Sequence, residues 1–404
     1  MFAILLNSVG TVILQVQNNF GVSESSASIL EAFKDLSIAA VSFLVASYIV
    51  RIGYKRAMML ALAFVGSMCL LMPSLGSFAM TKVLFAVTGT SFALIKVSVY
   101  ATIGIVTKDK KEHASFMNFI ESFFMIGILT GYFIFSAFIN DQDPHSTSWL
   151  NVYYLLSGIA FAAMLLLMSA PLDESSLKSD SNKSLSEEFA SMLKLAVTPL
   201  VLVFIVCAFT YVLIEQSIMS WLPTFNSKVL NLPATLSIQM ASILAASTAL
   251  GRFSAGFALR KIHWFLVLIV CLVAAGGLVL LAMPLAESSQ HEVTGWGSAP
   301  IAAFVFPLIG LFISPIYPAI NSVILSALPP RQHGPMSGLI VIFSALGGTT
   351  GSIITGHVFQ AYGGKTAFYF SLIPIGILIT FLFFFNRLQK KSEANVVIDI
   401  KGGH

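Results

Sequence analysis

Twelve long apolar segments constrain this chain more than any other feature of its sequence. They lie near residues 2–17, 28–50, 57–75, 78–106, 113–139, 150–170, 197–222, 235–259, 263–284, 298–327, 334–360 and 364–386. A helix of about 20 apolar residues spans the hydrocarbon core of a bilayer. The first segment is shorter, so it either begins upstream or crosses with little tilt. Only 10% of the residues are charged and 57% are hydrophobic, whereas about a quarter of a soluble domain is charged. The sequence therefore predicts an all-α membrane protein with twelve transmembrane helices.

One polar stretch divides the twelve segments into two sets of six. It reads DESSLKSDSNKSLSEEFASMLK over residues 173–194, and its Ser, Asp, Glu and Lys content is typical of a linker. We expect a six-helix bundle over 1–171, a linker over 172–196 that ends in a short surface helix, a second bundle over 197–386 and a tail over 387–404. Two such pseudo-symmetric halves are the pattern of a secondary transporter of the major facilitator type, which holds its solute near the midplane between them.

Lysine and arginine residues gather on one side of the predicted membrane. The loops after even-numbered segments, the linker and the tail contain Arg51, Lys55, Arg56, Lys108, Lys110, Lys111, Lys178, Lys183, Lys194, Arg260, Lys261, Arg331, Arg387, Lys390, Lys391 and Lys401. The opposite loops contain Lys82, Lys228 and Lys365. By the positive-inside rule, we expect both termini and the linker in the cytoplasm, in a multi-pass protein of the cell (inner) membrane.

The sequence has no features of a disulfide-rich protein, a metalloprotein or a nucleotide-binding enzyme. Cys69, Cys207 and Cys271 all lie in apolar segments, where they read as small buried residues and not as a disulfide framework. No His, Cys and Asp residues have metal-ligand spacing. The glycine-rich stretches GHVFQAYGG and LGGTTG follow no strand and lack a P-loop lysine. We therefore expect no enzyme activity, cofactor or metal, and no nucleic-acid partner.

A loop between the second and third segments resembles a family signature. ASYIVRIGYKRAM, residues 46–58, has Arg51, Gly53, Lys55 and Arg56 at the spacing of the major facilitator loop motif. Val50 stands where an acidic residue normally precedes the first arginine.

Four further stretches resemble the fucose permease-like branch, the fucose/galactose/glucose–proton symporters. They are HASFMNFIESFF (113–124), FTYVLIEQSIMSWLP (209–223), ALGRFSAG (249–256) and PIYPAINS (315–322). In that branch Glu215 matches a glutamate after Tyr-Val in the seventh helix, and Arg252 matches the arginine of a Gly-Arg-Phe run in the eighth. The resemblance implies the major facilitator fold and proton-coupled uptake.

The chain departs from that branch at three places. The family has an acidic residue in its first helix where this chain has Gly10 or a neighbour. It has a glutamate in its fourth helix about where Lys96 stands, and a fifth-helix glutamine that is Glu121 here. Neither the substrate nor the protonated residue is therefore carried over from the family.

Lys96 and Glu121 are the first pair of candidate functional residues. An ionisable group at the bilayer centre costs about 2.5–3.5 kcal/mol on insertion scales, so it usually faces a cavity or a partner. Lys96 lies about 16 Å and Glu121 about 12 Å from the cytoplasmic ends of their helices, so the two can pair. Such a pair could merely lock two helices. We favour the alternative, in which Lys96 binds an anionic or strongly hydrogen-bonding solute and Glu121 carries a proton.

Arg252 lies about 12 Å from the cytoplasmic end of its helix. It either pairs with Glu121 as a gate between the halves or caps carbonyls at the helix end. Arg51 in the loop signature is a further gating candidate.

Glu31, Lys34 and Asp35 lie on one face of the second helix, at i, i+3 and i+4. We place them towards the external side, like Glu215. They form either a hydrated rim of local ion pairs or an external gate, in which Glu31 and Lys34 are the gating residues. Asp35, the deepest acid of the three, and Glu215 are the other candidate proton carriers.

Uncharged polar residues complete the candidate solute site. Those we expect to bind solute are Asn118, Gln216, Tyr317 and Asn321, with Asn7 and Gln15 as further cavity residues. A small polar solute requires several such donors and acceptors with an aromatic face, although each residue alone could serve helix packing.

These patterns favour proton-coupled symport of a sugar, sugar derivative or organic anion by alternating access. A proton-driven exporter of drugs or metabolites is the alternative, and it should tolerate loss of Lys96. A membrane receptor or scaffold would move no solute. The expected partners are the solute, protons and the lipid bilayer, and a monomer suffices.

Overall fold

The computed structural model describes residues 1–106, 110–171, 185–286, 293–329 and 332–402. All regular elements in these ranges are helices. The first half contains α1 (Phe2–Asn7), α2 (Val9–Phe20), α3 (Glu24–Ala27), α4 (Ile29–Ile52), α5 (Tyr54–Leu71), α6 (Phe78–Val106), α7 (Lys110–Ser136), η1 (Thr147–Asn151) and α8 (Val152–Ser169). After α9 (Leu185–Ala196), the second half contains α10 (Pro199–Met219), α11 (Leu222–Lys228), α12 (Ala234–Ala258), α13 (Trp264–Leu285), η4 (Trp296–Ser298), α14 (Ile301–Val305), η5 (Phe306–Leu308), α15 (Ile309–Ile313), α16 (Ile316–Ala327), α17 (His333–Tyr362), α18 (Gly364–Tyr369) and α19 (Leu372–Gly402).

These helices make up the twelve predicted crossings, six in each half. Nine described segments are long and apolar enough to cross a bilayer. The remaining three crossings are α1 with α2, α4, and α7. Helix α4 is 24 residues long, and Glu31, Lys34 and Asp35 all lie in its first two turns. The predicted all-α fold is confirmed.

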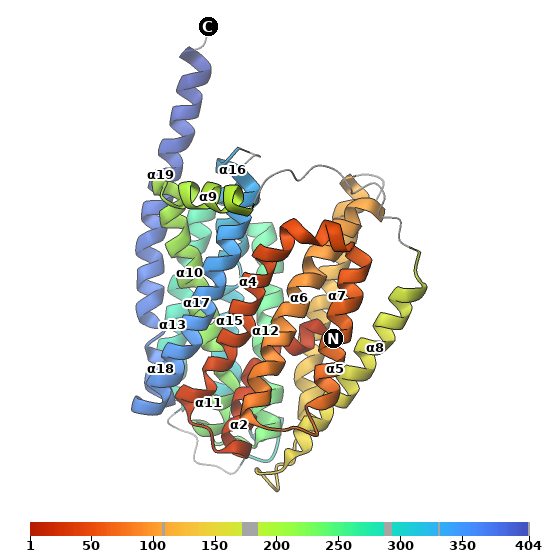
Figure 1. The fold of residues 1–404 in the computed structure, drawn as a ribbon. Coiled ribbons are helices and arrows are strands. Elements are labelled where there is room, and N and C mark those ends of the chain that lie inside the picture. Colours follow the sequence, from red (N-terminus) through yellow and green to blue (C-terminus); the bar gives the residue numbers. More distant parts are fainter. Residues whose placement is uncertain (107–109, 172–184, 287–292, 330–331, 403–404) are drawn as a thin grey trace.

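The bundle has two distinct ends. Helix α9 lies across one end, near the top of Figure 1, and α19 extends beyond it. We call this the linker end. Helix α11 and the end of α2, which α3 follows in the chain, lie at the opposite end, at the bottom of Figure 1.

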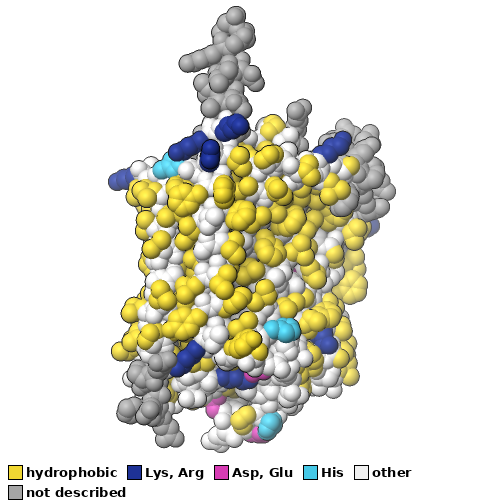
Figure 2. Space-filling model, turned by 90° about the vertical axis from the view of Figure 1, so that its left-hand side faces the viewer, with side chains coloured by type: hydrophobic (Ala, Val, Ile, Leu, Met, Phe, Trp, Pro, Cys, Tyr) yellow, Lys and Arg dark blue, Asp and Glu magenta, His cyan; other side chains and the backbone are white. Residues whose placement is uncertain are grey.

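The lateral surface of the bundle is apolar. Figure 2 shows a broad belt of hydrophobic side chains, with Lys and Arg near its upper and lower margins. Large side chains such as Phe64, Val270 and Leu166 are exposed on the helices. A soluble monomer rarely exposes a continuous apolar surface of this size, whereas lipid tails solvate it.

The two halves join at the end opposite the linker. There Ser25 N–H donates to Gln360 Oε1 at 3.1 Å, Thr235 N–H to Asp141 Oδ1 at 2.9 Å, and Gln239 Nε2 to Ser136 Oγ at 3.2 Å. Among the described residues, the hydrogen bonds between the halves lie at this end or towards the middle of the bundle. We call the end opposite the linker the closed end.

Helix α17 is the main bridge between the halves. It packs against α10 of its own half and against α3 and α4 of the other. Ser352 Oγ of α17 donates to the Ser28 carbonyl at 3.3 Å, and Trp221 Nε1 donates to the Ser352 carbonyl at 3.1 Å. Side chains of α4 that face α17 are therefore buried between the halves.

Candidate functional site

A buried ionic cluster lies on α4, facing the second half. The residue exposures of Glu31, Lys34 and Asp35 are 0%, 5% and 8%. Lys34 Nζ forms an ion pair with Glu31 Oε1, lies 3.4 Å from Asp35 Oδ1, and donates to the Leu6 carbonyl at 3.4 Å. We call these three residues the ionic trio. A hydrated rim, one of the two alternatives from the sequence, does not describe these buried side chains.

The second half completes the surroundings of the ionic trio. Ser220 Oγ donates to Glu31 Oε2 at 2.8 Å. A methyl group added to Gly348 of α17 would lie 2.5 Å from Asp35 Oδ2 and 3.1 Å from Gln216 Cγ. Asp35 therefore lies directly against α17 of the second half.

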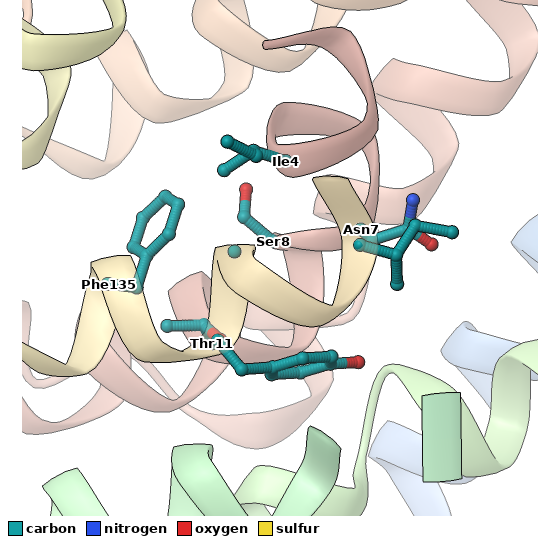
Figure 3. A pocket seen from close by; sticks show the side chains of 8 residues that line it. Ile4, Asn7, Ser8, Thr11 and Phe135 are labelled. Carbon is teal, nitrogen blue, oxygen red and sulfur yellow. The ribbon is translucent and has the colours of Figure 1, made fainter. Parts of the chain in front are cut away.

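A small polar pocket opens beside Glu31 and Lys34. Its lining comes from both halves: Leu6, Asn7, Val9, Gly10, Glu31, Lys34 and Tyr132 from the first, and Gln216, Met219 and Ser220 from the second. Its oxygen and nitrogen atoms include a carboxylate, an ammonium, two amides and two hydroxyls. A neighbouring pocket lies between α1, α2 and α7, where Ile4, Asn7, Ser8, Thr11 and Phe135 line it (Figure 3). Asn7 and Tyr132 belong to both pockets.

A second polar cluster lies within the second half. Tyr211 Oη donates to Glu215 Oε1 at 2.8 Å, and Arg252 Nη2 lies 3.8 Å from that same oxygen. The Tyr211 and Tyr317 rings stack with centroids 5.5 Å apart, and the Tyr317 hydroxyl is 2.8 Å from Ser344 Oγ. Asn321 lies beside that hydroxyl. The Arg252 side chain is 46% exposed and that of Glu215 is 16% exposed, whereas Tyr211 is buried.

Eight of the twelve predicted site residues lie in these two clusters. Glu31, Lys34, Asp35 and Gln216 lie at the ionic trio, while Glu215, Arg252, Tyr317 and Asn321 lie in the second cluster. Arg252 has Glu215 as its ion-pair partner. The side chains of Arg51, Asn118 and Glu121 lie outside the described part of the structure, so the pairing of Glu121 with Lys96 or Arg252 stays a prediction.

Lys96 is exposed on α6. Its Nζ lies 5.8 Å from the centroid of the Phe92 ring and 6.0 Å from that of Tyr100. Cation–π attraction of this kind holds an ammonium group at an aromatic surface. Phe92 in turn contacts Phe2 and Phe124, so Lys96 lies at the edge of an aromatic group shared by α1, α6 and α7.

The closed end contains an ion pair that the sequence did not indicate. Lys228 Nζ of α11 lies 2.5 Å from Glu24 Oε1 of α3. Burial alone would raise the pKa of Glu24. Hydrogen bonds from Lys228 and from the Glu24 backbone, together with the charge of Lys228, outweigh burial, so the pKa of Glu24 lies below its usual value. The residues are 204 positions apart, and no local spacing signals such a pair.

Ser220 and Tyr211 are the other polar residues that sequence reasoning missed. Ser220 directly follows α10, and its partner Glu31 comes from the other half. Tyr211 lies on α10 and donates to Glu215 four residues later, a spacing that the sequence does contain. Pro223 is one sequence signal of the break in the helix at Ser220. Proline lacks an N–H, so the carbonyl four residues earlier, that of Met219, has no backbone donor and the helix is disrupted there. No described cluster of His, Cys, Asp and Glu is suited to a metal ion.

A family model described as the Major Facilitator Superfamily matches residues 1–306. The MFS transporter asaE of Aspergillus flavus is 30% identical over 132 residues, which make up 32% of this chain and 27% of that protein. The chain thus aligns with about a quarter of the length of this curated relative.

Solved structures share the fold over nearly the whole chain. A bacterial homolog of the human lysosomal transporter Spinster, inward-facing and occupied, has a TM-score of 0.76 at 14% identity, with 97% of this chain and 95% of that chain covered. The D-xylose-proton symporter has a TM-score of 0.69 at 12% identity and coverages of 95% and 94%. The E. coli fucose:proton symporter FucP has a TM-score of 0.60 at 14% identity and coverages of 95% and 96%. Because the family model matches most of this chain, residues 1–306, the chain belongs to the major facilitator superfamily.

Proposed function

We propose that this protein is a secondary transporter that moves a small polar solute by alternating access, coupled to protons. Membership of the superfamily supports transport as the activity. Two similar folds carry the names of a fucose:proton and a D-xylose-proton symporter, which supports proton coupling and a sugar-like solute.

The observation that carries the proton proposal is the charge of the ionic trio. Two carboxylates, Glu31 and Asp35, share one ammonium group in a buried site between the halves. Among the described residues Lys34 is the one cation paired with them, which leaves one negative charge uncompensated, and burying it is unfavourable by several kcal/mol. A proton removes that charge. Glu31 already accepts from both Lys34 and Ser220, so Asp35 is the residue we assign to the proton.

The second cluster is the site we assign to the solute. Arg252 offers donors, Glu215 an acceptor and Tyr317 an aromatic face, and these are the groups that orient a polar ring. Gln216 follows Glu215 in the chain and lines the pocket beside Glu31, and Asn321 lies beside Tyr317. Lys96, Asn118 and Glu121 are proposed to complete the site from the first half.

The linker end is proposed to face the cytoplasm. The distribution of Lys and Arg supports this orientation, with both termini and the linker on that side of the cell (inner) membrane. Arg51 and Arg252 are then gating residues of the cytoplasmic side, and Glu31 with Lys34 those of the external side. A monomer contains the complete site.

An exporter of amphipathic compounds is the second candidate. The Phe253 and Phe257 rings are exposed near Arg252 and lie edge to face with centroids 5.1 Å apart. Such an aromatic surface suits a solute with an apolar part.

Uptake into liposomes under an inward proton gradient tests the proposal. The solutes are radiolabelled L-fucose, D-glucosamine, D-glucuronate and the amphipathic cation tetraphenylphosphonium, each with wild type and with Lys96→Ala. Gradient-driven uptake of a polar solute supports symport, and selective loss of D-glucuronate uptake in Lys96→Ala assigns Lys96 to anion binding. Efflux of tetraphenylphosphonium from preloaded liposomes, without uptake of the other three solutes, favours the exporter, and no flux of any of the four contradicts the proposal.

A further inference from the structure

The seventh membrane crossing is interrupted beside the ionic trio. Helix α10 ends at Met219 and α11 begins at Leu222, with Pro223 in its first turn. Because proline has no N–H, the Met219 carbonyl loses its usual donor. The first crossing is also interrupted, at Ser8 between α1 and α2. These two interruptions occur in the corresponding helix of each half, whereas the tenth crossing, broken into α14, η5, α15 and α16, has the continuous α6 as its counterpart.

The two interruptions face each other between the halves. A methyl group at Gly10 would lie 2.9 Å from both the Met219 and the Ser220 carbonyl oxygens, so α2 approaches this part of α10 at the distance only glycine allows. Residues from both interruptions line the pocket beside Glu31. Interrupted helices in corresponding positions of two repeats often mark the site on which a transporter acts.

Ser220 is the one described residue at this junction whose side chain hydrogen-bonds an ionised group of the other half. Its hydroxyl donates to Glu31 Oε2, while Lys34 is paired with Glu31 Oε1. Glu31 thus has a separate donor for each oxygen. Charge-assisted hydrogen bonds are about twice as strong as neutral ones, so loss of the Ser220 bond is a substantial change for Glu31.

From this geometry we propose that Ser220 is a positioning residue that couples separation of the halves to protonation of the ionic trio. When the closed end opens, Ser220 moves away with the second half and Glu31 loses one donor. Lys34 Nζ then moves towards Glu31 and away from Asp35. The Asp35 carboxylate, no longer beside a positive charge, binds a proton. When the halves close again, Ser220 returns to Glu31, Lys34 is shared and Asp35 releases the proton. This inference rests on the proposed proton coupling through Asp35.

The surroundings leave few other groups to carry this proton. Among the described residues lining the pocket, Tyr132 of α7 is the one titratable side chain besides Glu31 and Lys34. Helices α1, α2 and α10 contribute the uncharged Asn7, Gly10 and Gln216, and α17 contributes Gly348 next to Asp35.

The test follows opening of the closed end as a function of pH, with protons as the only ligand. Ser28→Cys is the reporter, since Ser28 Cβ lies 2.6 Å from where a Gly356 methyl would be and Ser28 is fully buried. Cys69, Cys207 and Cys271 are first replaced by alanine. Labelling by N-ethylmaleimide is measured in proteoliposomes between pH 5 and pH 8 and normalised to the denatured protein at each pH.

Four variants are compared with the reporter parent. In the parent we expect labelling to rise as the pH falls. Ser220→Ala should label about tenfold faster at pH 8, which corresponds to about 1.4 kcal/mol, and should respond less to pH. Ser220→Thr, which keeps a hydroxyl, should restore the parent profile. Ser217→Ala is the matched control, because Ser217 lies one turn earlier on α10 and donates to Gly351 within its own half. Asp35→Asn should abolish the pH response.

The outcomes separate the two proposals. If Ser220→Ala behaves like Ser217→Ala, or if Ser220→Thr fails to restore the profile, the inference on Ser220 is wrong. If Asp35→Asn keeps the full pH response, the assignment of the proton to Asp35 is wrong, whatever Ser220 does.

Discussion

Lys228 of α11 and Glu24 of α3 form an ion pair that joins the two halves at the closed end, with Nζ and Oε1 2.5 Å apart. The Lys228 side chain is 37% exposed, so water and salt weaken the pair. Exposed ion pairs contribute about 0.2–1 kcal/mol in double-mutant cycles. The pair is therefore a modest lock on the closed conformation.

Removal of this lock should open the closed end more often. We expect Lys228→Gln to raise maleimide labelling of Ser28→Cys by up to about fivefold, the factor that corresponds to about 1 kcal/mol. Lys82→Gln is the matched control, because Lys82 lies over the Phe78 ring of its own helix. Equal labelling of the two variants would show that the pair does not hold the halves together.

The pH dependence of this lock follows from the lowered pKa of Glu24. A carboxyl whose pKa is lower in the closed state stabilises that state fully above its ordinary pKa of about 4.3, and loses the contribution as the pH falls through the lowered value. Between pH 5 and pH 8 the lock should be constant. Lys228→Gln should therefore shift the labelling of Ser28→Cys by the same factor at every pH in this range. A shift that vanishes between pH 5 and pH 8 would contradict this account.

Close packing at Gly356 should be sensitive to a single methyl group. An added Cβ would lie 2.6 Å from Ser28 Cβ and 2.7 Å from a Trp221 ring carbon. Overpacking of this kind costs about 1–3 kcal/mol, so Gly356→Ala should lower the melting temperature by several degrees in detergent. Gly277→Ala should maintain or raise it, because a methyl group there meets nothing within 4 Å and alanine favours a helix. Equal melting temperatures for both variants would refute the tight contact.

The second cluster should govern solute affinity and leave proton sensing intact. Glu215→Gln removes the charge that faces Arg252 and weakens the bond from Tyr211. We expect the KM for the transported solute to rise about tenfold, in keeping with the loss of a charged hydrogen-bond partner. The pH response of Ser28→Cys labelling should not change. A lost pH response with unchanged KM would reverse the roles of Glu215 and Asp35.

The sequence was sufficient to predict the fold because each membrane helix must satisfy its own backbone and bury about 20 apolar residues. The surface helix expected at the end of the linker is α9. Charged residues inside apolar segments likewise identified Glu31, Lys34, Asp35, Glu215 and Arg252, since such residues are rare in lipid.

The partners of these residues could not be predicted in the same way. Helical spacing brought Glu31, Lys34 and Asp35 together, but it does not show whether that face meets water or another helix. Burial of the trio depends on α17 and Ser220, which lie more than 180 residues further along the chain. The ion pair of Arg252 with Glu215 joins α12 to α10, and no pattern in the sequence favours it over a partner in the other half.

The most direct test of the central claim is the movement of protons with solute. A pH-sensitive dye inside proteoliposomes reports proton entry after addition of the solute that wild type transports, for wild type and for Asp35→Asn, while counterflow of labelled solute shows that each variant still binds and exchanges it. We predict that wild type acidifies the lumen and that Asp35→Asn exchanges solute without acidifying it. Acidification by Asp35→Asn at the wild-type rate would contradict the assignment of the coupled proton to the ionic trio.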